Sequence, residues 1–211
     1  MNCQCQGIEE LFNQKQVDKE LSRYRTKGPD KTTRILVQAI KEQSVKGSTL
    51  LDVGGGVGAV QHELMAAGIE KVIGVDASGA YLNAAMQEAQ RRGKARQVIY
   101  YHGNFVDLAE EISSADIVTL NRVICCYNDM DALVGSSAKR AKRLYGLVFP
   151  RDTWWIKLGV AVGNILYRIR NSSFRGFVHT TEAVEAVVRH SGFERKFYHR
   201  TLLWQIAVYS R

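Results

Sequence analysis

A glycine-rich turn between an apolar segment and a helical one is the feature that most constrains how this chain can fold. Leu50–Val53 reads as a buried strand, and glycines follow at Gly54, Gly56 and Gly58 before a helical segment begins. Glycine lets the backbone turn tightly, and it lets a ligand approach where a Cβ would otherwise stand. The helix that follows presents unpaired N–H groups at its start. In an open α/β sheet, a ligand binds at the carboxyl end of such a strand.

Short apolar segments alternate with helical segments over most of the chain. Strands are expected at 49–53, 71–75, 98–102, 116–120 and 144–149, and helices at 57–67, 79–92, 105–112, 129–142 and 180–190. Strands that are buried on both faces read as continuous apolar runs, so this alternation predicts a parallel sheet covered by helices. Two β-rich segments at 193–199 and 202–209 leave no room for a helix between them. They must pair as a hairpin, so at least one final strand runs antiparallel.

The residues before the glycine-rich turn form a separate helical region. Residues 8–44 read as two helices that Gly28-Pro29 divides, because proline disfavours helical geometry in the residue before it. At 211 residues the chain fits one domain with a small cap. We assign 1–47 to a helical cap and 48–211 to the ligand-binding domain.

An apolar segment at 154–170 is inserted after the fifth strand. It is rich in Trp, Ile, Leu and Val, but Lys157 and Asn164 interrupt it. It is therefore too short and too broken for a transmembrane helix. It fits a cap over an apolar pocket or a helix lying on a membrane surface, and a buried core helix is the alternative.

Charge and cysteine content place only weak limits on the cell compartment and on the class of partner. The net charge of +8 is compatible with nucleic acid, an acidic substrate or an anionic membrane surface, and equally with a solvated basic surface. The four cysteines form two close pairs, Cys3/Cys5 and Cys125/Cys126, whose spacing fits none of the common zinc patterns. We expect reduced thiols, no metal site and no signal peptide, hence a cytoplasmic protein that could be peripheral at a membrane.

Two acidic residues narrow the class of cofactor. Asp52 lies at the end of the first strand, where it suits the sulfonium and ammonium of S-adenosylmethionine (SAM) but would repel a dinucleotide pyrophosphate. Asp76 ends the second strand and can accept hydrogen bonds from both ribose hydroxyls of an adenosine. The pattern Gly54-x-Gly56-x-x-Ala59 also matches the dinucleotide fingerprint loosely, so an NAD-dependent oxidoreductase remains a rival interpretation.

The stretch Leu51–Gly58, followed by Gly74–Ser78, resembles class I SAM-dependent methyltransferases over roughly 48–211. The resemblance implies a Rossmann-like, seven-stranded, mostly parallel sheet with a C-terminal antiparallel hairpin and helices on both faces. It also implies a SAM site. The implied cofactor-binding residues are Asp52, Gly54, Gly56, Gly58, Asp76, Ala77, Asn104, Phe105 and Asn121. The family usually has Asp where this chain has Asn104, whose side-chain oxygen can still accept from the adenine amino group; Asp107 is the fallback.

A fainter similarity links the chain to the magnesium-protoporphyrin O-methyltransferase group and its bacterial relatives. It rests on the helical N-terminal region, on Arg122–Tyr127 and on Phe174–His179. That resemblance implies methylation of a carboxylate on a large, flat, apolar acceptor, which the apolar 154–167 segment would suit. We therefore expect a small or lipophilic acceptor that is methylated on oxygen.

The remaining chemistry depends on which atom accepts the methyl group. A carboxylate acceptor needs no general base, whereas a hydroxyl or ring carbon would use one. The candidates for such a base are His102, Tyr127 and His179. An RNA methyltransferase and a non-catalytic SAM-binding protein are the alternatives. Without an appended RNA-binding segment, we do not expect a nucleic-acid partner.

Overall fold

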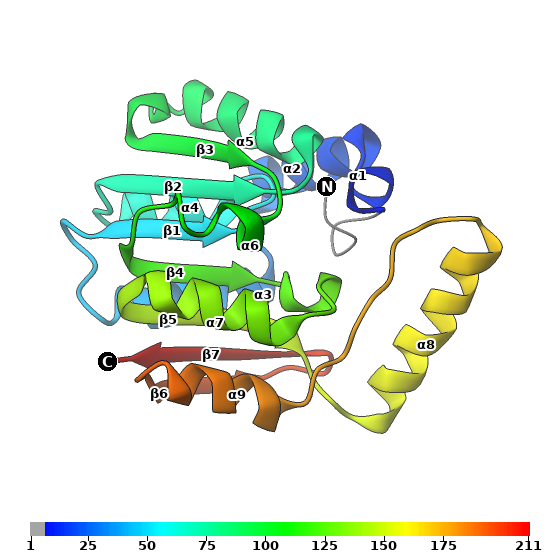
Figure 1. Ribbon diagram of the computed structural model, residues 1–211. Coiled ribbons are helices and arrows are strands. Elements are labelled where there is room, and N and C mark those ends of the chain that lie inside the picture. Colours follow the sequence, from blue (N-terminus) through cyan, green and yellow to red (C-terminus); the bar gives the residue numbers. More distant parts are fainter. Residues whose placement is uncertain (1–6) are drawn as a thin grey trace.

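The central feature of the computed structural model, which describes residues 7–211, is one twisted sheet of seven strands in the order β3-β2-β1-β4-β5-β7-β6 (Figure 1). The strands are β1 (Thr49–Val53), β2 (Lys71–Asp76), β3 (Val98–His102), β4 (Ala115–Asn121), β5 (Ala141–Pro150), β6 (Glu194–Arg200) and β7 (Trp204–Ser210). Neighbours are parallel except around β7, which runs antiparallel to β5 and to β6. The expected sheet and its final hairpin are therefore confirmed.

Helices cover both faces of this sheet. They are α1 (Ile8–Leu11), α2 (Gln14–Lys27), α3 (Lys31–Lys41), α4 (Ala59–Ala66), α5 (Gly79–Arg91), α6 (Phe105–Leu108), α7 (Met130–Arg140), α8 (Trp154–Ile169) and α9 (Thr181–His190), with short 3-10 turns η2 (Ala95–Gln97) and η3 (Ile124–Cys126). Alternate strand residues point to opposite faces. Leu51 and Val118 accordingly pack with α6, α7 and α9, whereas their neighbours Leu50 and Ile117 pack with α3, α4 and α5.

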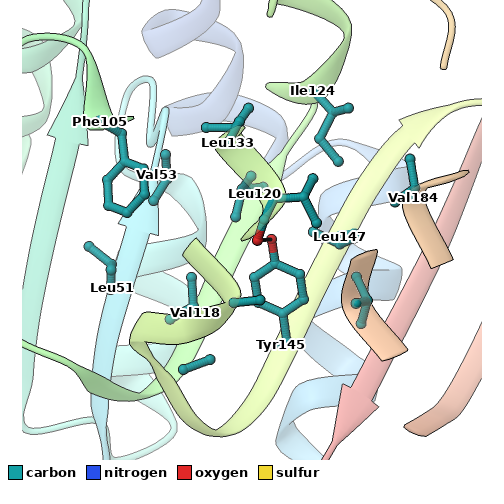
Figure 2. Packing of buried hydrophobic residues seen from close by; sticks show 14 of the residues in the cluster. Leu51, Val53, Phe105, Val118, Leu120, Ile124, Leu133, Tyr145, Leu147 and Val184 are labelled. Atoms are coloured by element: carbon teal, nitrogen blue, oxygen red, sulfur yellow. Dashed lines mark hydrogen bonds between the residues drawn. The ribbon is translucent and has the colours of Figure 1, made fainter. Parts of the chain in front are cut away.

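The core beneath α7 is almost wholly apolar (Figure 2). Within this core, the Tyr145 hydroxyl lies 2.6 Å from the Ser137 hydroxyl oxygen, and the two form a buried hydrogen bond. A buried polar group that is hydrogen-bonded avoids most of its desolvation cost. The sheet and its helices therefore form a rigid base for the carboxyl ends of β1, β2 and β4.

The N-terminal region divides into three helices rather than the two expected from Gly28-Pro29. The additional break falls at Asn13, whose side chain accepts a hydrogen bond from the Gln16 N–H and so begins α2. Asp30 begins α3 in the same way by accepting from the N–H groups of Thr32 and Thr33. Because α3 packs against β5 and β7, it belongs to the layer that covers the sheet.

A buried carboxylate joins α2 to α5. The Glu88 side chain is fully buried and pairs with Arg25 of α2 at 2.8 Å, and with Arg91 at 2.6 Å and Arg92 at 2.7 Å. Hydrogen bonds from Arg91 are the main cause that holds the pKa of Glu88 well below its usual range, against the opposing effect of burial. This cluster holds α2 in place over the end of the sheet.

Replacing Glu88 by Gln should lower the free energy of unfolding by about 1–3 kcal/mol at pH 7, because it leaves three guanidinium groups without their shared acceptor. Urea unfolding would measure this. Glu110→Gln is the control: Glu110 is 96% exposed and pairs with Arg140, so its loss should cost less than about 1 kcal/mol. A depressed carboxyl pKa stabilises above the ordinary value of 4.5, so the effect of Glu88→Gln should shrink as the pH falls below it. Equal losses for both variants at pH 7 would contradict this role.

Candidate functional site

The turn after β1 has a backbone that requires glycine. Gly54, Gly56 and Gly58 have φ of 65°, 56° and 78°, all in the left-handed region that residues with a Cβ avoid. A Cβ on Gly54 would lie 2.4 Å from Cγ2 of Val123, so the turn also packs directly on the loop after β4. The expected glycine-rich turn thus brings two neighbouring strand ends together.

A cavity of about 350 Å³ opens beside this turn, at the carboxyl ends of the parallel strands. Apolar and aromatic side chains form most of its wall, together with a few polar ones. Its lining includes Ile8, Phe12, Gln16, Glu20, Val53, Gly54, Gly56, Val75, Asp76, Ala77, Tyr81, Gly103, Asn104, Phe105, Asn121, Arg122, Val123, Cys125, Cys126, Tyr127, Leu133 and Trp204. The cavity therefore combines residues from the cap with residues from the sheet, as a small-molecule site does.

Asp76 is the best-placed carboxylate in this cavity. Its Oδ2 accepts from the Gly56 N–H at 3.0 Å and its Oδ1 accepts from the Ser78 N–H at 2.9 Å. Burial raises the pKa of Asp76, although these two hydrogen bonds oppose the rise. The carboxylate is thus fixed between the two turns, where it keeps lone pairs for the vicinal hydroxyls of a ribose.

Asn104 also lines the cavity and presents a donor rather than the expected acceptor. Its Oδ1 begins α6 by accepting from the Val106 N–H at 3.3 Å. Its Nδ2 is buried and has no hydrogen-bond partner among the described residues. A donor here fits a ring nitrogen of adenine better than the adenine amino group that we expected it to bind. Phe105, which is buried beside it, offers an apolar surface for a purine.

Asp52 occupies a different position from the one its charge suggested. Its carboxyl group is completely buried beneath the turn, where it accepts from the Thr119 hydroxyl at 2.7 Å and from the Gln61 amide at 3.1 Å. Burial raises the pKa of Asp52 to about 6. Neither Asp52 nor Gly58 belongs to the cavity lining. Its geometry assigns Asp52 to joining β1, β4 and α4 beneath the turn rather than to direct contact with a sulfonium.

Glu20 of α2 supplies a second carboxylate that the sequence patterns did not single out. Its Oε2 accepts from the Tyr81 hydroxyl at 2.6 Å, and both side chains line the cavity close to Gly56. With Asp76, it gives this side of the cavity an acidic character that suits a cationic ligand group. Glu20 reaches the cavity because α2 packs over the end of the sheet. No local sequence motif predicts that packing.

Arg122 is the cationic residue of the cavity wall and has a strained backbone. Its φ of 64° is uncommon for a residue with a Cβ, and its N–H donates to the Val148 carbonyl at 2.8 Å. Its Nη2 lies 2.6 Å from Oδ2 of Asp30, and its guanidinium stands 6.0 Å from the Trp204 ring centroid. Burial acts to raise the pKa of Asp30. The charge of Arg122 and the hydrogen bonds from the start of α3 outweigh this effect, so the pKa of Asp30 is lowered. Strain that is held in this way is typical of functional sites.

The other residues expected after β4 also meet at the cavity. Asn121 lines it and donates through Nδ2 to the Thr33 hydroxyl at 2.9 Å. Cys125 and Cys126 line it as free thiols with their sulfur atoms 3.8 Å apart. Cys3 and Cys5 lie outside the described residues.

Of the three candidate general bases, the structure places Tyr127 in the cavity wall and the two histidines elsewhere. Tyr127 is buried there. His102 is exposed and lies 3.5 Å from the Glu9 carboxylate. His179 is absent from the cavity lining, and its Nε2 lies 2.8 Å from the Tyr127 carbonyl oxygen. His102 and His179 therefore do not face the cavity, so Tyr127 is the candidate that can reach a bound acceptor.

Sequence comparison shows that this chain is similar to known methyltransferases. Residues 51–144 match the family model for a methyltransferase domain. Two curated relatives are ribosomal protein L11 methyltransferases from Tolumonas auensis and Vibrio vulnificus, each 29% identical over 112 residues, or 53% of this chain. The match spans 37% of each relative's length, so the chain corresponds to just over a third of those proteins.

Solved structures agree in fold over nearly the whole chain. Magnesium protoporphyrin IX methyltransferase from Synechocystis PCC 6803, with bound S-adenosylhomocysteine (SAH), gives a TM-score of 0.73 at 22% identity and 97% coverage of both chains. A putative RNA methyltransferase from Pyrococcus horikoshii gives 0.61 at 13% identity, covering 94% of this chain and 96% of the other. At these identities the likeness shows the fold alone.

Replacing Asp76 by Asn should weaken binding of S-adenosylhomocysteine by about tenfold or more, because the ribose hydroxyls lose a charged acceptor. Isothermal titration calorimetry would measure the affinity. Asp107→Asn is the matched control, because Asp107 is exposed and lies outside the cavity lining, so its affinity should not change. If Asp107→Asn weakened binding while Asp76→Asn did not, the assignment of the ribose site would be wrong.

Proposed function

We propose that this chain, which carries a methyltransferase domain at residues 51–144 and takes SAM as its methyl donor, methylates a carboxylate oxygen on an apolar acceptor. The observation that carries the acceptor class is the position of Arg122, a cation in the wall of an otherwise largely apolar cavity. A guanidinium binds a carboxylate through parallel N–H donors, which fixes its orientation.

The polar groups of the cavity suit SAM. Gly54 and Gly56 of the turn line the cavity, and Asp76 and the unpartnered Nδ2 of Asn104 suit ribose and adenine. Glu20 suits the positively charged end of the molecule. When bound, SAM supplies a methyl group that its sulfonium has already activated.

The residues of the chain then have only to bind and orient the acceptor. A carboxylate is ionised at neutral pH, so it attacks without a general base. Arg122 holds it through the donors that Asp30 leaves available, since Asp30 takes one of the five guanidinium N–H groups. The Trp204 ring beside the guanidinium offers an apolar surface for the rest of the acceptor. Catalysis by positioning alone is sufficient for a transfer of this kind.

The likeness to magnesium protoporphyrin IX methyltransferase supports methylation on oxygen and an extended apolar acceptor. The Arg122 side chain is about a third exposed, and this leaves room for an acceptor larger than the cavity. The acceptor class that we propose is therefore a large apolar carboxylic acid.

The diagnostic experiment uses the stability of the product. The protein is incubated with SAM labelled in its methyl group and a panel of apolar acids that includes long-chain fatty acids and porphyrins with propionate side chains. A methyl ester releases volatile methanol on mild alkaline treatment, whereas an ether or an N-methyl product does not. In a parallel reaction with total RNA in place of the acids, label that is stable to alkali and lost on ribonuclease treatment would instead identify an RNA acceptor.

Arg122→Gln should reduce turnover of a carboxylate acceptor by about 10–100-fold, which corresponds to loss of a charged hydrogen bond. Its affinity for S-adenosylhomocysteine should remain close to that of the native protein. Tyr127→Phe should retain most activity, because a carboxylate needs no base. The opposite pattern, with activity lost in Tyr127→Phe and kept in Arg122→Gln, would indicate a hydroxyl acceptor and a base at Tyr127.

A further inference from the structure

Helix α8 is held to the molecule along one face only. Ile156 is buried, and Asn164 exchanges two hydrogen bonds of 2.8 Å with the backbone of Gly176. One turn further on, Tyr167 packs edge-on against Phe174, with ring centroids 5.3 Å apart. Figure 1 shows α8 standing beyond the carboxyl ends of the parallel strands, joined to α9 by the segment that carries these contacts. The inner face is thus fixed by packing and hydrogen bonds.

The opposite face of α8 is apolar and exposed. The residues concerned are Trp154 (75% exposed), Leu158 (57%), Val162 (49%), Ile165 (59%), Leu166 (49%) and Ile169 (71%). Most are three or four residues apart, so they form one stripe along the helix. These six are the majority of the ten large apolar side chains that are most exposed in residues 7–211. A monomeric protein rarely exposes such a continuous apolar surface unless something binds there.

A second exposed apolar element adjoins the start of this helix. Leu202 (74% exposed) and Leu203 (49%) form the tip of the β6–β7 hairpin. Arg151, which precedes α8, donates its backbone N–H to the Leu203 carbonyl at 3.0 Å and a side-chain N–H to the Thr201 carbonyl at 3.3 Å. The hairpin tip and the first turn of α8 are therefore fixed close to each other.

The charges on α8 itself are all of one sign. Helix α8 contains no Asp or Glu. Lys157 and Arg168 are eleven residues apart, which is about three turns, so they lie on the same flank of the helix. Arg170 follows at its end. Arg151 and Asp152 precede it, and the Asp152 carboxylate accepts hydrogen bonds from the Thr181 N–H and hydroxyl. An apolar stripe with a cationic flank is the arrangement of a helix that lies in a membrane interface, where long cationic side chains reach the lipid headgroups.

We propose that the outer face of α8, together with the Leu202–Leu203 tip, docks on an anionic lipid surface. A second copy of the chain is a poorer occupant, because its own cationic residues on α8 and its net charge of +8 would oppose close approach. Among residues 7–211, no helix has the length and apolar character that a membrane span requires, so the contact is peripheral. This surface goes beyond the methyl transfer proposed above and does not depend on it.

Vesicle flotation tests the proposal with lipid binding as the readout. The native protein should float with vesicles of phosphatidylcholine and phosphatidylglycerol, and much less with phosphatidylcholine alone, because the cations favour anionic headgroups. Leu158→Asp should weaken binding to the mixed vesicles by about tenfold or more. Met86→Asp, which makes the same charge change at a 48% exposed residue of α5, should bind as the native protein does. Both variants should retain their affinity for S-adenosylhomocysteine, which shows that they are folded.

Trp154 gives an independent spectroscopic readout. Its emission should shift to shorter wavelength when the mixed vesicles are added, and Trp154→Phe should lose most of that shift. Failure of the native protein to float would overturn the proposal. So would binding that Leu158→Asp leaves unchanged, because the cations alone would then account for it. A dimer by light scattering that Leu158→Asp converts to a monomer, without flotation of the native protein, would show that this face binds a second copy instead.

Discussion

The site depends on a turn that only glycine can make. Three residues in the left-handed region within five positions bring the end of β1 against the loop after β4, and they place the Gly56 N–H on the Asp76 carboxylate. Beneath the turn, the buried carboxyl group of Asp52 joins Thr119 of β4 to Gln61 of α4. One local backbone constraint therefore positions the ends of three strands, and the cavity lies where those ends meet.

The N-terminal helices and the sheet both contribute residues to the cavity. Helix α2 contributes Glu20 to the cavity wall, and the cluster around Glu88 holds α2 against α5. Helix α3 contributes Asp30, which pairs with Arg122 in the cavity wall. The carboxylates of Asp76 and Glu20 and the guanidinium of Arg122 thus line the same cavity. The cavity therefore offers acidic groups to a cationic donor and a cation to an anionic acceptor.

The sequence was most informative where local chemistry decides the structure. The glycines, the apolar strands and the final hairpin each predicted their elements. Asp52 was harder to interpret, because a charged residue at a strand end can point into the cavity or beneath the turn, and only the packing of Thr119 and Gln61 decides this. Glu20 and Trp204 could not be found from motifs. They reach the cavity through the docking of a distant helix and through the antiparallel insertion of β7.

The most direct test of this account is calorimetric titration of the native protein with S-adenosylhomocysteine, with NAD as the comparison. The cavity geometry predicts binding of S-adenosylhomocysteine at micromolar concentration and no measurable binding of NAD, because the Glu20 carboxylate beside Gly56 would repel a pyrophosphate at the turn. Binding of NAD without binding of S-adenosylhomocysteine would contradict the account and would identify the cavity as a dinucleotide site.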